Sequence, residues 1–548
     1  KKGNYMKMTW QELLASRGIA IPQKPEDTIN KRVVVNPELS QKEKTFSLNI
    51  ELDEDQNTAV QLALAGKSFC LIGKAGTGKT TTEREIVKAI LSRMNGRTHI
   101  FRIQGTGEKV ESPAAAVVSY TRVAAGNSRN AICKDEELRN AFFHNVTTIH
   151  NLLEYAPVFF YDDEKEKESM RFIPQRNALN PLNVQTIAIE ESSMVDLNLW
   201  DRLYDAMLSG TQVIFIGDIN QLPPVFGPSI LNYALVQLPI VELRTVYRQK
   251  FDSLVLTNAH NILEGKEVEE GPDFKIIEGG TKQHGQTVTM LQLAGSLKRW
   301  YESGEYKPDE DIILSPFNKG DLGSDSINSH VAQFLNDGDV YEIIAGIRKL
   351  YVAVGDKIMF QKQVGRIINI KHNPMYAGKI PKPHSKHLSR FGVMLEEDDL
   401  DSLEDDGLAH VEYNLEAMSK EDMEELTHQA SHVVEIELET GELLALRKAG
   451  ELSAQNFSLA YALTVHKAQG CEWRKVILVL HKDHSILAFN ELLYTAVTRA
   501  AKQVVIVGKK FMVAKAIATR RIKGDSLKEK VEYFNANLAQ SHISCVKK

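Results

Sequence analysis

The chain has 548 residues, which is too many for one hydrophobic core, and its length suggests about three or four domains. Its composition is that of an ordinary water-soluble protein, and no apolar run approaches the roughly 20 residues that span a bilayer, which excludes a membrane protein. The N-terminus lacks the pattern of a signal peptide. The four cysteines are far apart and form no CxxC pair, so we expect a reducing, cytoplasmic compartment and no structural zinc.

The net charge of −6 is unevenly distributed along the chain. Residues 391–425 hold fourteen acidic residues and a single lysine, a charge of −13, which leaves about +7 on the rest of the chain. A remainder of this sign can supply the basic track that binding to a nucleic-acid backbone requires. The acidic run is expected to be a solvated loop, and a shield over the neighbouring basic segment is the alternative.

A glycine-rich loop lies between an apolar strand pattern at residues 67–72 and an expected helix from Thr81 to Met94. The loop, residues 73–80, reads GKAGTGKT and fits the pattern G-x-x-x-x-G-K-[ST]. Its glycines allow backbone N–H groups to turn inward around phosphate oxygens, and the helix N-terminus adds a partial positive charge. Lys79 is placed to reach the β- and γ-phosphates, and the Thr80 hydroxyl to ligate Mg²⁺. Because strand, loop and helix occur together, a nucleoside triphosphate site is favoured over a chance match in a turn.

Acidic and amide side chains follow two later strand patterns. Residues 186–189 are a buried strand that runs directly into Glu190 and Glu191. In a fold with a phosphate loop, one carboxylate at this place can hold Mg²⁺ through water while the other orients and deprotonates the attacking water, although such pairs are often only solvated. The next strand, residues 213–216, leads to Gln221, which is placed to sense a γ-phosphate.

Two segments outside this core offer groups for the rest of a nucleotide. Asp53 is an expected N-cap, and the amide of Gln56 beside it can pair with adenine, although an exposed helical glutamine is ordinarily only solvated. Farther along, Tyr247 offers an aromatic ring for the base and Arg248 a guanidinium for the phosphates.

A polar strand end and an aromatic hairpin are candidates for nucleic-acid contacts. Residues 114–120 form a strand pattern that ends in Ser119, Thr121 and Arg122, which suits a backbone phosphate and suits an ordinary loop equally well. The segments 157–161 and 170–174 predict a hairpin with a charged tip. Its Phe159 and Phe160 can stack on bases or split a duplex, or can simply pack the hairpin onto its domain.

The pattern restarts in the second half with a strand at residues 311–314. Strand patterns at 341–360 and a clean alternation at 432–447 surround the basic segment 362–390, which predicts a small SH3-type barrel inserted in a second core. Further expected elements of that core are strands at 457–462, 476–480 and 504–507, a helix at about 490–500, and a terminal helix with a loose tail after residue 528.

Together these segments resemble superfamily 1 helicases, specifically the RecD-like and Dda-like branch called superfamily 1B. The matching segments stand in family order across about residues 50–510: Gln56, GKAGTGKT (73–80), SYTRVAA (119–125), VTTIH (146–150), IEESSMVD (189–196), GDINQLPPV (217–225), VYRQ (246–249), LTVHKAQGCE (463–472) and YTAVTRA (494–500). The resemblance implies an α/β fold of two RecA-like P-loop domains with ATP between them, single-stranded DNA across both, a β-hairpin insertion in the first and an SH3-like β-barrel insertion in the second.

The resemblance implies a lead-in at 1–45 and a first RecA-like domain at 46–240, with its hairpin at about 155–182. It implies a second RecA-like domain at 241–335 and 452–548, with the barrel at 336–451.

The resemblance also implies roles for single residues. Gln56 and Tyr247 would recognise adenine, Glu191 would be the base, and Gln221 would couple the γ-phosphate to the second domain. Arg248 and Arg499 would be arginine fingers, and Glu472 would lie near the nucleotide. The phosphate loop holds the nucleotide through Gly73, Ala75, Gly76, Thr77, Gly78, Lys79, Thr80 and Thr81. The DNA-contacting positions are Ser119, Thr121, Arg122, Thr148, His150, Phe159, Phe160, Thr464 and His466. At the metal position beside Thr80 the family has aspartate, whereas this chain has Glu190, one methylene longer.

We therefore expect an ATP- and Mg²⁺-dependent DNA helicase, a monomer of phage or bacterial origin that acts on single-stranded DNA and duplex junctions with replication or recombination proteins as possible partners. The 5′-to-3′ direction is implied by the branch resembled. The alternatives are an RNA helicase or protein-stripping translocase, and an ATP-gated DNA-binding or recombination-loading module in which hydrolysis has decayed at Glu190.

Overall fold

The computed structural model describes residues 52–103, 108–162, 167–224, 227–246, 253–278, 290–346, 348–360, 363–376, 429–438, 441–454, 456–538 and 543–547. For residues 157–162 and 167–172 and for Leu291 it describes the backbone alone. The N-terminal lead-in, most of the basic segment and the acidic run lie outside the described residues, as do Tyr247 and Arg248.

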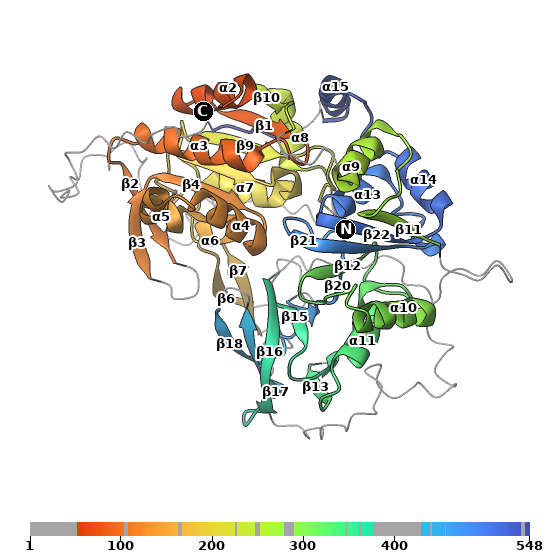
Figure 1. Ribbon diagram of the computed structural model, residues 1–548. Coiled ribbons are helices and arrows are strands. Elements are labelled where there is room, and N and C mark those ends of the chain that lie inside the picture. The colour runs from red at the N-terminus through yellow and green to blue at the C-terminus, as the bar shows by residue number, and fades with distance from the viewer. Residues whose placement is uncertain are drawn as a thin grey trace, which may run out of the picture. The chain divides into compact units, whose positions relative to one another are not determined.

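A six-stranded parallel sheet, the first core sheet, has the strand order β10-β1-β9-β8-β4-β5. Figure 1 labels its strands β10, β1, β9 and β4. Along β1, Phe69 and Leu71 enter one hydrophobic cluster, and Cys70 and Ile72 enter another on the opposite face. Because both faces are buried, its central strands are continuous apolar runs, which is why the sequence pattern located them. The strands are β1 (Phe69–Gly73), β4 (Ala115–Ser119), β5 (Val146–Thr148), β8 (Thr186–Glu190), β9 (Gln212–Gly217) and β10 (Ile240–Leu243).

The helices of this part of the chain supply many of the apolar residues that cover the sheet. They are α2 (Glu54–Leu64), α3 (Lys79–Ser92), α4 (Arg122–Ile132), α5 (Glu136–Phe142), α6 (Ile149–Leu152), α7 (Leu197–Ala206) and α8 (Ile230–Gln237), with 3₁₀ turns at Phe143–Asn145 and Ser192–Met194. Asp53 caps α2 as predicted, because its carboxylate accepts a hydrogen bond from the Gln56 N–H at 2.7 Å.

A five-stranded parallel sheet, the second core sheet, has the order β11-β22-β21-β12-β20. Ile312 and Leu314 of β12 enter one cluster, and Ile313 enters the cluster on the other face. Its strands are β11 (Phe274–Ile277), β12 (Asp311–Ser315), β20 (Ala462–Thr464), β21 (Trp473–Leu480) and β22 (Ala500–Gly508). The helices are α9 (Leu254–Glu264), α10 (Met290–Glu302), α11 (Ser324–Leu335), α13 (Asn490–Val497) and α14 (Lys510–Ala518), with a 3₁₀ turn at Lys482–His484.

Between β12 and β20 the chain forms an antiparallel sheet with the order β18-β17-β16-β15-β19 and a separate hairpin of β13 and β14. Val434, Ile436 and Leu438 lie on its buried face, as the alternation predicted. The strands are β13 (Tyr341–Ala345), β14 (Arg348–Val352), β15 (Lys357–Phe360), β16 (Gln363–His372), β17 (Gln429–Leu438), β18 (Leu443–Lys448) and β19 (Phe457–Leu459).

The predicted single strand at residues 457–462 is wrong. Phe457 pairs with Phe360 in the antiparallel sheet, whereas Ala462 pairs with Ile313 in the second core sheet, so β19 and β20 are two strands of two sheets. Both strands are short and apolar and only two residues separate them. A continuous apolar run cannot reveal that the chain changes partner, because the same burial pattern results.

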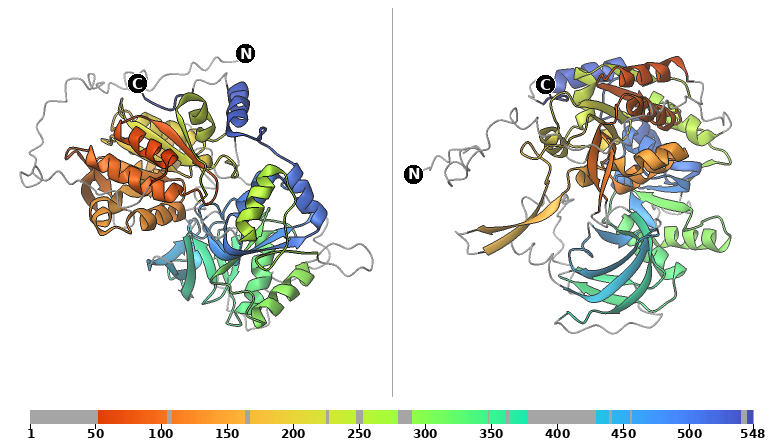
Figure 2. Two further views of the ribbon diagram at one scale, coloured as in Figure 1. Left: turned by 45° about the horizontal axis from the view of Figure 1, so that its top comes forward. Right: turned by 90° about the vertical axis from the view of Figure 1, so that its left-hand side faces the viewer.

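Two antiparallel hairpins belong to the first half of the chain. The strands β6 (Ala156–Asp162) and β7 (Lys167–Ile173) pair over their whole length and form a long ribbon (Figure 2). They extend into the charged run that was predicted to be the tip. The sequence analysis missed the hairpin of β2 (Thr98–Arg102) and β3 (Lys109–Pro113), in which polar residues interrupt the few apolar ones.

The C-terminal segment is more ordered than predicted. Helix α15 (Leu527–Leu538) begins two residues before the expected start, and residues 543–547 pack onto the first core. Cys545 is fully buried, and the Trp200 Nε1–H donates a hydrogen bond to the Ser544 carbonyl at 3.0 Å, so these residues are not a loose tail. None of the helices in the described ranges combines the length and apolar character of a membrane span.

Candidate nucleotide and nucleic-acid site

The phosphate loop lies between β1 and α3, as predicted. Gly76 and Gly78 both have φ of 82°, the left-handed region that favours glycine. A Cβ on Gly73 would lie 2.3 Å from Thr77 Oγ1, so a side chain there would close the loop. Lys79 Nζ donates hydrogen bonds to the carbonyls of Gly73 at 2.7 Å and Lys74 at 3.0 Å. The ammonium is therefore held at the loop, where a phosphate can take it over.

The second core reaches this loop through Tyr494 of α13. The Ala75 N–H donates a hydrogen bond to the Tyr494 hydroxyl at 3.0 Å, and that hydroxyl donates to Asp218 Oδ2 at 2.6 Å. Burial and the negative charge of Asp218 raise the pKa of Tyr494 well above its usual value, so the phenol stays protonated. Tyr494 was not assigned a role from the sequence, although it opens the segment YTAVTRA.

Glu190 and Glu191 stand at the carboxyl end of β8, as expected. Glu190 Oε2 accepts a hydrogen bond from Ser128 Oγ at 2.8 Å. Burial and the neighbouring Glu191 raise the pKa of Glu190 to about 7, while Ser128 and the positive charges of Lys79 and Arg499 work against that rise. Glu191 has φ of 50°, a left-handed conformation that strains a non-glycine residue and is frequent at functional sites.

Glu83 of α3 is a third carboxylate near this half-buried pair. Its side chain is fully buried, and neither carboxylate oxygen has a hydrogen-bond partner within the described ranges. Burial, followed by the charges of Glu190 and Glu191, raises the pKa of Glu83 well above its usual value. A signal was available in the sequence: Glu83 occupies the same helical stripe as the buried Ile86 and Ile90.

The residues present fit a nucleotide-bound Mg²⁺. Among the described residues no three or more acidic, histidine or cysteine side chains converge as a metal cage. Mg²⁺ in such sites is held by one or two protein oxygens together with phosphates and waters, so a cage is not required. Thr80 follows Lys79 with an exposed side chain, and Glu190 supplies the carboxylate.

The loop after β9 connects the two core sheets. Leu222 N–H donates a hydrogen bond to Thr495 Oγ1 at 2.9 Å, and Gln469 Nε2 donates to the Leu222 carbonyl at 2.9 Å. Gln221 is buried beside these contacts, and its Oε1 has no hydrogen-bond partner in the described part of the chain. The predicted γ-phosphate sensor therefore lies where both cores meet.

Arg499, the predicted finger of the second core, is buried next to this loop. Its guanidinium donates hydrogen bonds to the carbonyls of Thr495 and Cys471, each at 3.2 Å. Its charge is close enough to lower the pKa of Glu190, which brings it to the acidic end of β8. The other predicted finger, Arg248, and the adenine contact Tyr247 lie outside the described residues.

Gln56 is not the exposed, solvated glutamine that its helical position suggested. It is 3% exposed, and its Oε1 accepts a hydrogen bond from the Asp53 N–H at 3.1 Å in a capping box. Contact with adenine stays a prediction. Glu472 has an exposed side chain.

The predicted DNA-contacting residues of the first core gather at the carboxyl ends of β4 and β5. Ser119 pairs in register with Thr148 across the two strands. Thr121 caps α4 and Thr148 caps α6, each accepting a hydrogen bond from a backbone N–H at 3.1 Å. His150 packs near the Tyr155 ring, with 5.1 Å between the ring centroids.

Thr464 and His466, the corresponding residues of the second core, follow β20. Thr464 Oγ1 accepts a hydrogen bond from the Lys467 N–H at 3.3 Å. The loop they begin is joined to α4, because Asn127 Nδ2 donates to the Gly470 carbonyl at 2.7 Å. For Phe159 and Phe160 the structure gives only their places in β6, opposite Met170 and Ser169.

Comparison with known proteins finds two domain models that each match part of the chain. Residues 56–227 match the model of an AAA domain, and residues 459–507 match the model of the UvrD-like helicase C-terminal domain. The chain is 25% identical over 456 residues to the ATP-dependent RecD2 DNA helicase of Deinococcus radiodurans. The match covers 82% of this chain and 48% of the Deinococcus protein. It is also 25% identical over 497 residues to the RecBCD enzyme subunit RecD of Mycobacterium tuberculosis. That match covers 87% of this chain and 73% of the Mycobacterium protein.

These matches relate the chain to RecD-like helicases of superfamily 1B. It spans about half the length of the Deinococcus relative and about three quarters of the Mycobacterium relative. A crystal structure of the Pif1 helicase from Bacteroides in complex with ADP-AlF3 and ssDNA has a TM-score of 0.46 and 17% identity, and the match covers 90% of this chain and 99% of that one. Both matched domain models lie on the segments that hold the phosphate loop and the YTAVTRA segment.

Proposed function

We propose that the chain is an ATP-dependent DNA helicase that hydrolyses ATP between its two core sheets and moves on single-stranded DNA. The observation that carries this proposal is the hydrogen bond between the Ala75 N–H of the phosphate loop and the Tyr494 hydroxyl of the second core. A phosphate bound at this loop must act on the second core directly, which is the coupling that a two-core motor needs. The kinship with RecD and RecD2 supports DNA as the substrate.

In this proposal each polar group at the loop has one role. Lys79 and the loop amides hold the β- and γ-phosphates, and Thr80 with Glu190 holds Mg²⁺, which neutralises phosphate charge when it is bound. Glu191 accepts the proton of the attacking water. Gln221 senses the γ-phosphate, and Arg499 and Arg248 stabilise the transferred charge, so losing either arginine lowers turnover by about three orders of magnitude. Gln56 and Tyr247 hold adenine, and Glu472 lies near the nucleotide.

Movement requires two grips on one strand of DNA. The hydroxyls and basic groups at β4 and β5 form the first grip, and those after β20 form the second. When ATP binding draws the cores together and hydrolysis releases them, alternate gripping moves the chain along the strand. These groups suit sugar and phosphate, so little base specificity is expected. We propose the 5′-to-3′ direction, in replication, repair or recombination, by kinship.

We also propose the domain division stated above, with β6–β7 as the hairpin insertion of the first RecA-like domain and β13–β19 as an SH3-like barrel in the second. The five-stranded antiparallel order supports the barrel. The C-terminal boundary of the barrel is placed at residue 459 instead of 451, because β19 pairs with β15. A monomeric, cytoplasmic enzyme is part of the same proposal.

The test is a fork assay with the purified chain. ATP turnover should rise when single-stranded DNA is added, and should rise less with RNA of the same sequence. A duplex with a 5′ single-stranded tail should be unwound, whereas one with a 3′ tail should not. Binding of ATP without turnover would instead favour a non-hydrolysing module, and Lys79→Ala serves as the inactive control.

A further inference from the structure

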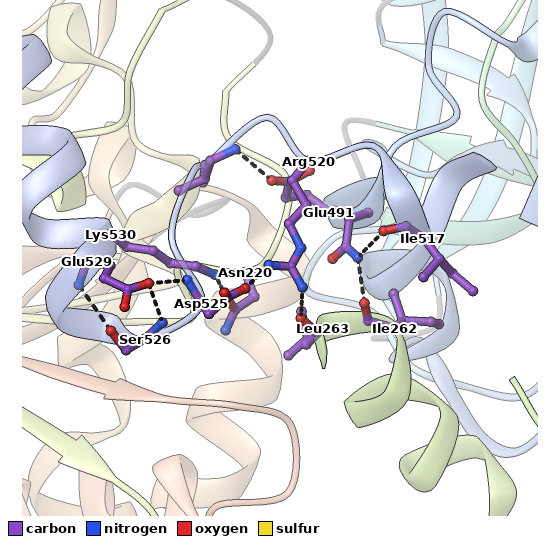
Figure 3. A network of polar contacts seen from close by, with 12 residues as sticks. Asn220, Ile262, Leu263, Glu491, Ile517, Arg520, Asp525, Ser526, Glu529 and Lys530 are labelled. Atoms are coloured by element: carbon purple, nitrogen blue, oxygen red, sulfur yellow. Dashed lines mark hydrogen bonds and ion pairs between the residues drawn. The ribbon is translucent and has the colours of Figure 1, made fainter. Parts of the chain in front are cut away.

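The segment from Thr519 to Leu538, here called the C-terminal strap, connects α14 of the second core to α15 on the first. Its first half is fixed to the second core (Figure 3). The Glu491 carboxylate of α13 accepts hydrogen bonds from the backbone N–H groups of Arg521 at 3.0 Å and Ile522 at 2.9 Å. Arg520 Nη2 donates to the Leu263 carbonyl of α9 at 2.6 Å.

The second half of the strap is fixed to the first core. Helix α15 packs against α8, and its Phe534 is 4% exposed within the first-core cluster that includes Leu231 and Ala234. From the same helix, Lys530 Nζ donates a hydrogen bond to Asn220 Oδ1 (Figure 3). The strap therefore holds both cores and ends beside the loop that follows β9.

Lys530 is the outer end of a hydrogen-bond chain that reaches the phosphate loop. Asn220 donates to Asp218 Oδ1 twice, from its backbone N–H and from Nδ2, each at 2.9 Å. Asp218 Oδ2 accepts from the Tyr494 hydroxyl at 2.6 Å, and that hydroxyl accepts from the Ala75 N–H at 3.0 Å. Asp218 is fully buried, so its orientation depends on these donors.

The charge of Lys530 lies within electrostatic reach of the same loop. Burial lowers its pKa, the carboxylates of Asp218 and Glu491 raise it, and the cations Arg520 and Lys74 lower it further. Lys74 belongs to the phosphate loop, so the ammonium of Lys530 adds a positive charge near the place where a triphosphate binds. Without it, the buried carboxylate of Asp218 would face the nucleotide with less compensation.

We propose that Lys530 is a positioning residue for ATP, which acts through Asn220 to hold Asp218 and Tyr494 against the phosphate loop. The affinity of the loop for ATP then depends on a helix that is remote in sequence and attached to both cores. This inference rests on the proposed ATPase function. It goes beyond that function because none of the helicase segments includes the strap.

The test compares Lys530→Met with Lys528→Met, which removes an exposed lysine of the same helix. The KM for ATP is measured with saturating single-stranded DNA, and the Kd for ATP with Mg²⁺ is measured by calorimetry. Losing a charged donor to a buried group should raise KM and Kd about tenfold for Lys530→Met. Lys528→Met should change neither by more than about twofold. Lys530→Arg, which keeps a cationic donor, should recover much of the loss.

Two further variants keep the test decisive. Lys530→Gln replaces the methionine variant if that protein does not fold. In an Asn220→Ala background, Lys530→Met should add little, because the two residues act in one chain. A lowered kcat with unchanged KM and Kd would show that the strap only maintains the fold and would overturn the proposal, as would equal effects of Lys530→Met in both backgrounds. If the unaltered chain binds ATP without turnover, the proposed function fails while the Kd comparison still decides the role of Lys530.

Discussion

Glu190 stands where the family resemblance implies an aspartate, and its surroundings give the longer side chain a second consequence. Burial and Glu191 raise its pKa from the ordinary 4.5 to about 7. Because the folded state holds the proton more tightly than the unfolded state, the stability this group contributes is present below pH 4.5 and is lost as the pH rises through 7. The ionised carboxylate thus costs stability at the pH where it can bind Mg²⁺.

We expect Glu190→Gln to raise the melting temperature of the nucleotide-free protein at pH 8, because the neutral amide keeps the Ser128 contact without a buried charge. The increase should shrink at pH 6, where the wild-type carboxyl is mostly protonated. ATP turnover should fall by at least about tenfold, since a metal-positioning carboxylate is lost. Thermal unfolding at the two pH values measures the effect, and Glu302→Gln on the exposed end of α10 is the control. An unchanged or lower melting temperature at pH 8 would contradict it.

A substitution at Tyr494 can test the contact between the two cores by removing a single oxygen atom. Tyr494→Phe removes the hydroxyl that donates to Asp218 and accepts from Ala75, and leaves the ring in place. We expect the free energy of unfolding to fall by about 1–3 kcal/mol, because a buried carboxylate loses a donor. Urea unfolding monitored by fluorescence gives the value, and Tyr301→Phe, at an exposed tyrosine, should have no effect. Equal stability of both variants would mean that water replaces the hydroxyl.

At the scale of elements, the sequence predicted those strands that consist of an uninterrupted run of apolar residues. Strands buried on both faces, such as β1 and β9, were located to within two residues. The β2–β3 hairpin escaped because its polar, half-exposed residues carry no clear alternation. The strands β19 and β20 were merged because burial is the same in either sheet. The residues after 528 were predicted as a helix and a loose tail, since nothing local in the sequence reveals which core residues 519–538 and 543–547 contact.

The β6–β7 hairpin gives a prediction at this scale. If Phe159 and Phe160 split the duplex, replacing both by alanine should slow unwinding about tenfold, the size of losing one base-stacking contact. ATP turnover stimulated by single-stranded DNA should stay within about twofold of the wild type, because a wedge acts on the duplex junction and not on the hydrolysis of ATP. A fork-unwinding assay beside an ATPase assay separates the two. Equal losses in both assays would show that these residues support the fold or the grip rather than the junction.

At the scale of the whole molecule, the segments predicted which residues lie at the phosphate loop and the strand ends, but not the contacts that join the two cores. Glycine loop, acidic pair and glutamine could be assigned because each has a characteristic local pattern. The contact of Ala75 with Tyr494 joins residues 419 positions apart, and the contact of Lys530 with Asn220 joins residues 310 apart. Neither pair carries a local pattern. Both cores therefore contribute residues and charges to the site.

Substitutions at and near Arg122 can test how this chain, with its net negative charge, would bind DNA. Burial lowers the pKa of Arg122, and the carboxylate of Glu442, an exposed residue beside β18, acts against that change. In the proposed grip on DNA, Glu442 therefore competes with a phosphate for the Arg122 guanidinium. We expect Arg122→Gln to weaken binding to single-stranded DNA and to reduce the slope of log K against log salt by roughly 0.7, the value for one phosphate on a single strand.

Glu442→Gln should have the opposite sign and tighten binding at low salt, because it removes the competing anion while leaving the cation. Lys298→Gln, at an exposed lysine of α10, controls for the general loss of positive charge. Fluorescence anisotropy with a labelled oligonucleotide across a salt series measures all three variants. If Arg122→Gln and Lys298→Gln alter the slope equally, only overall charge matters. A specific effect of Arg122 with an opposite effect of Glu442 would instead place the strand between the end of β4 and the antiparallel sheet, because these two residues come from those two elements.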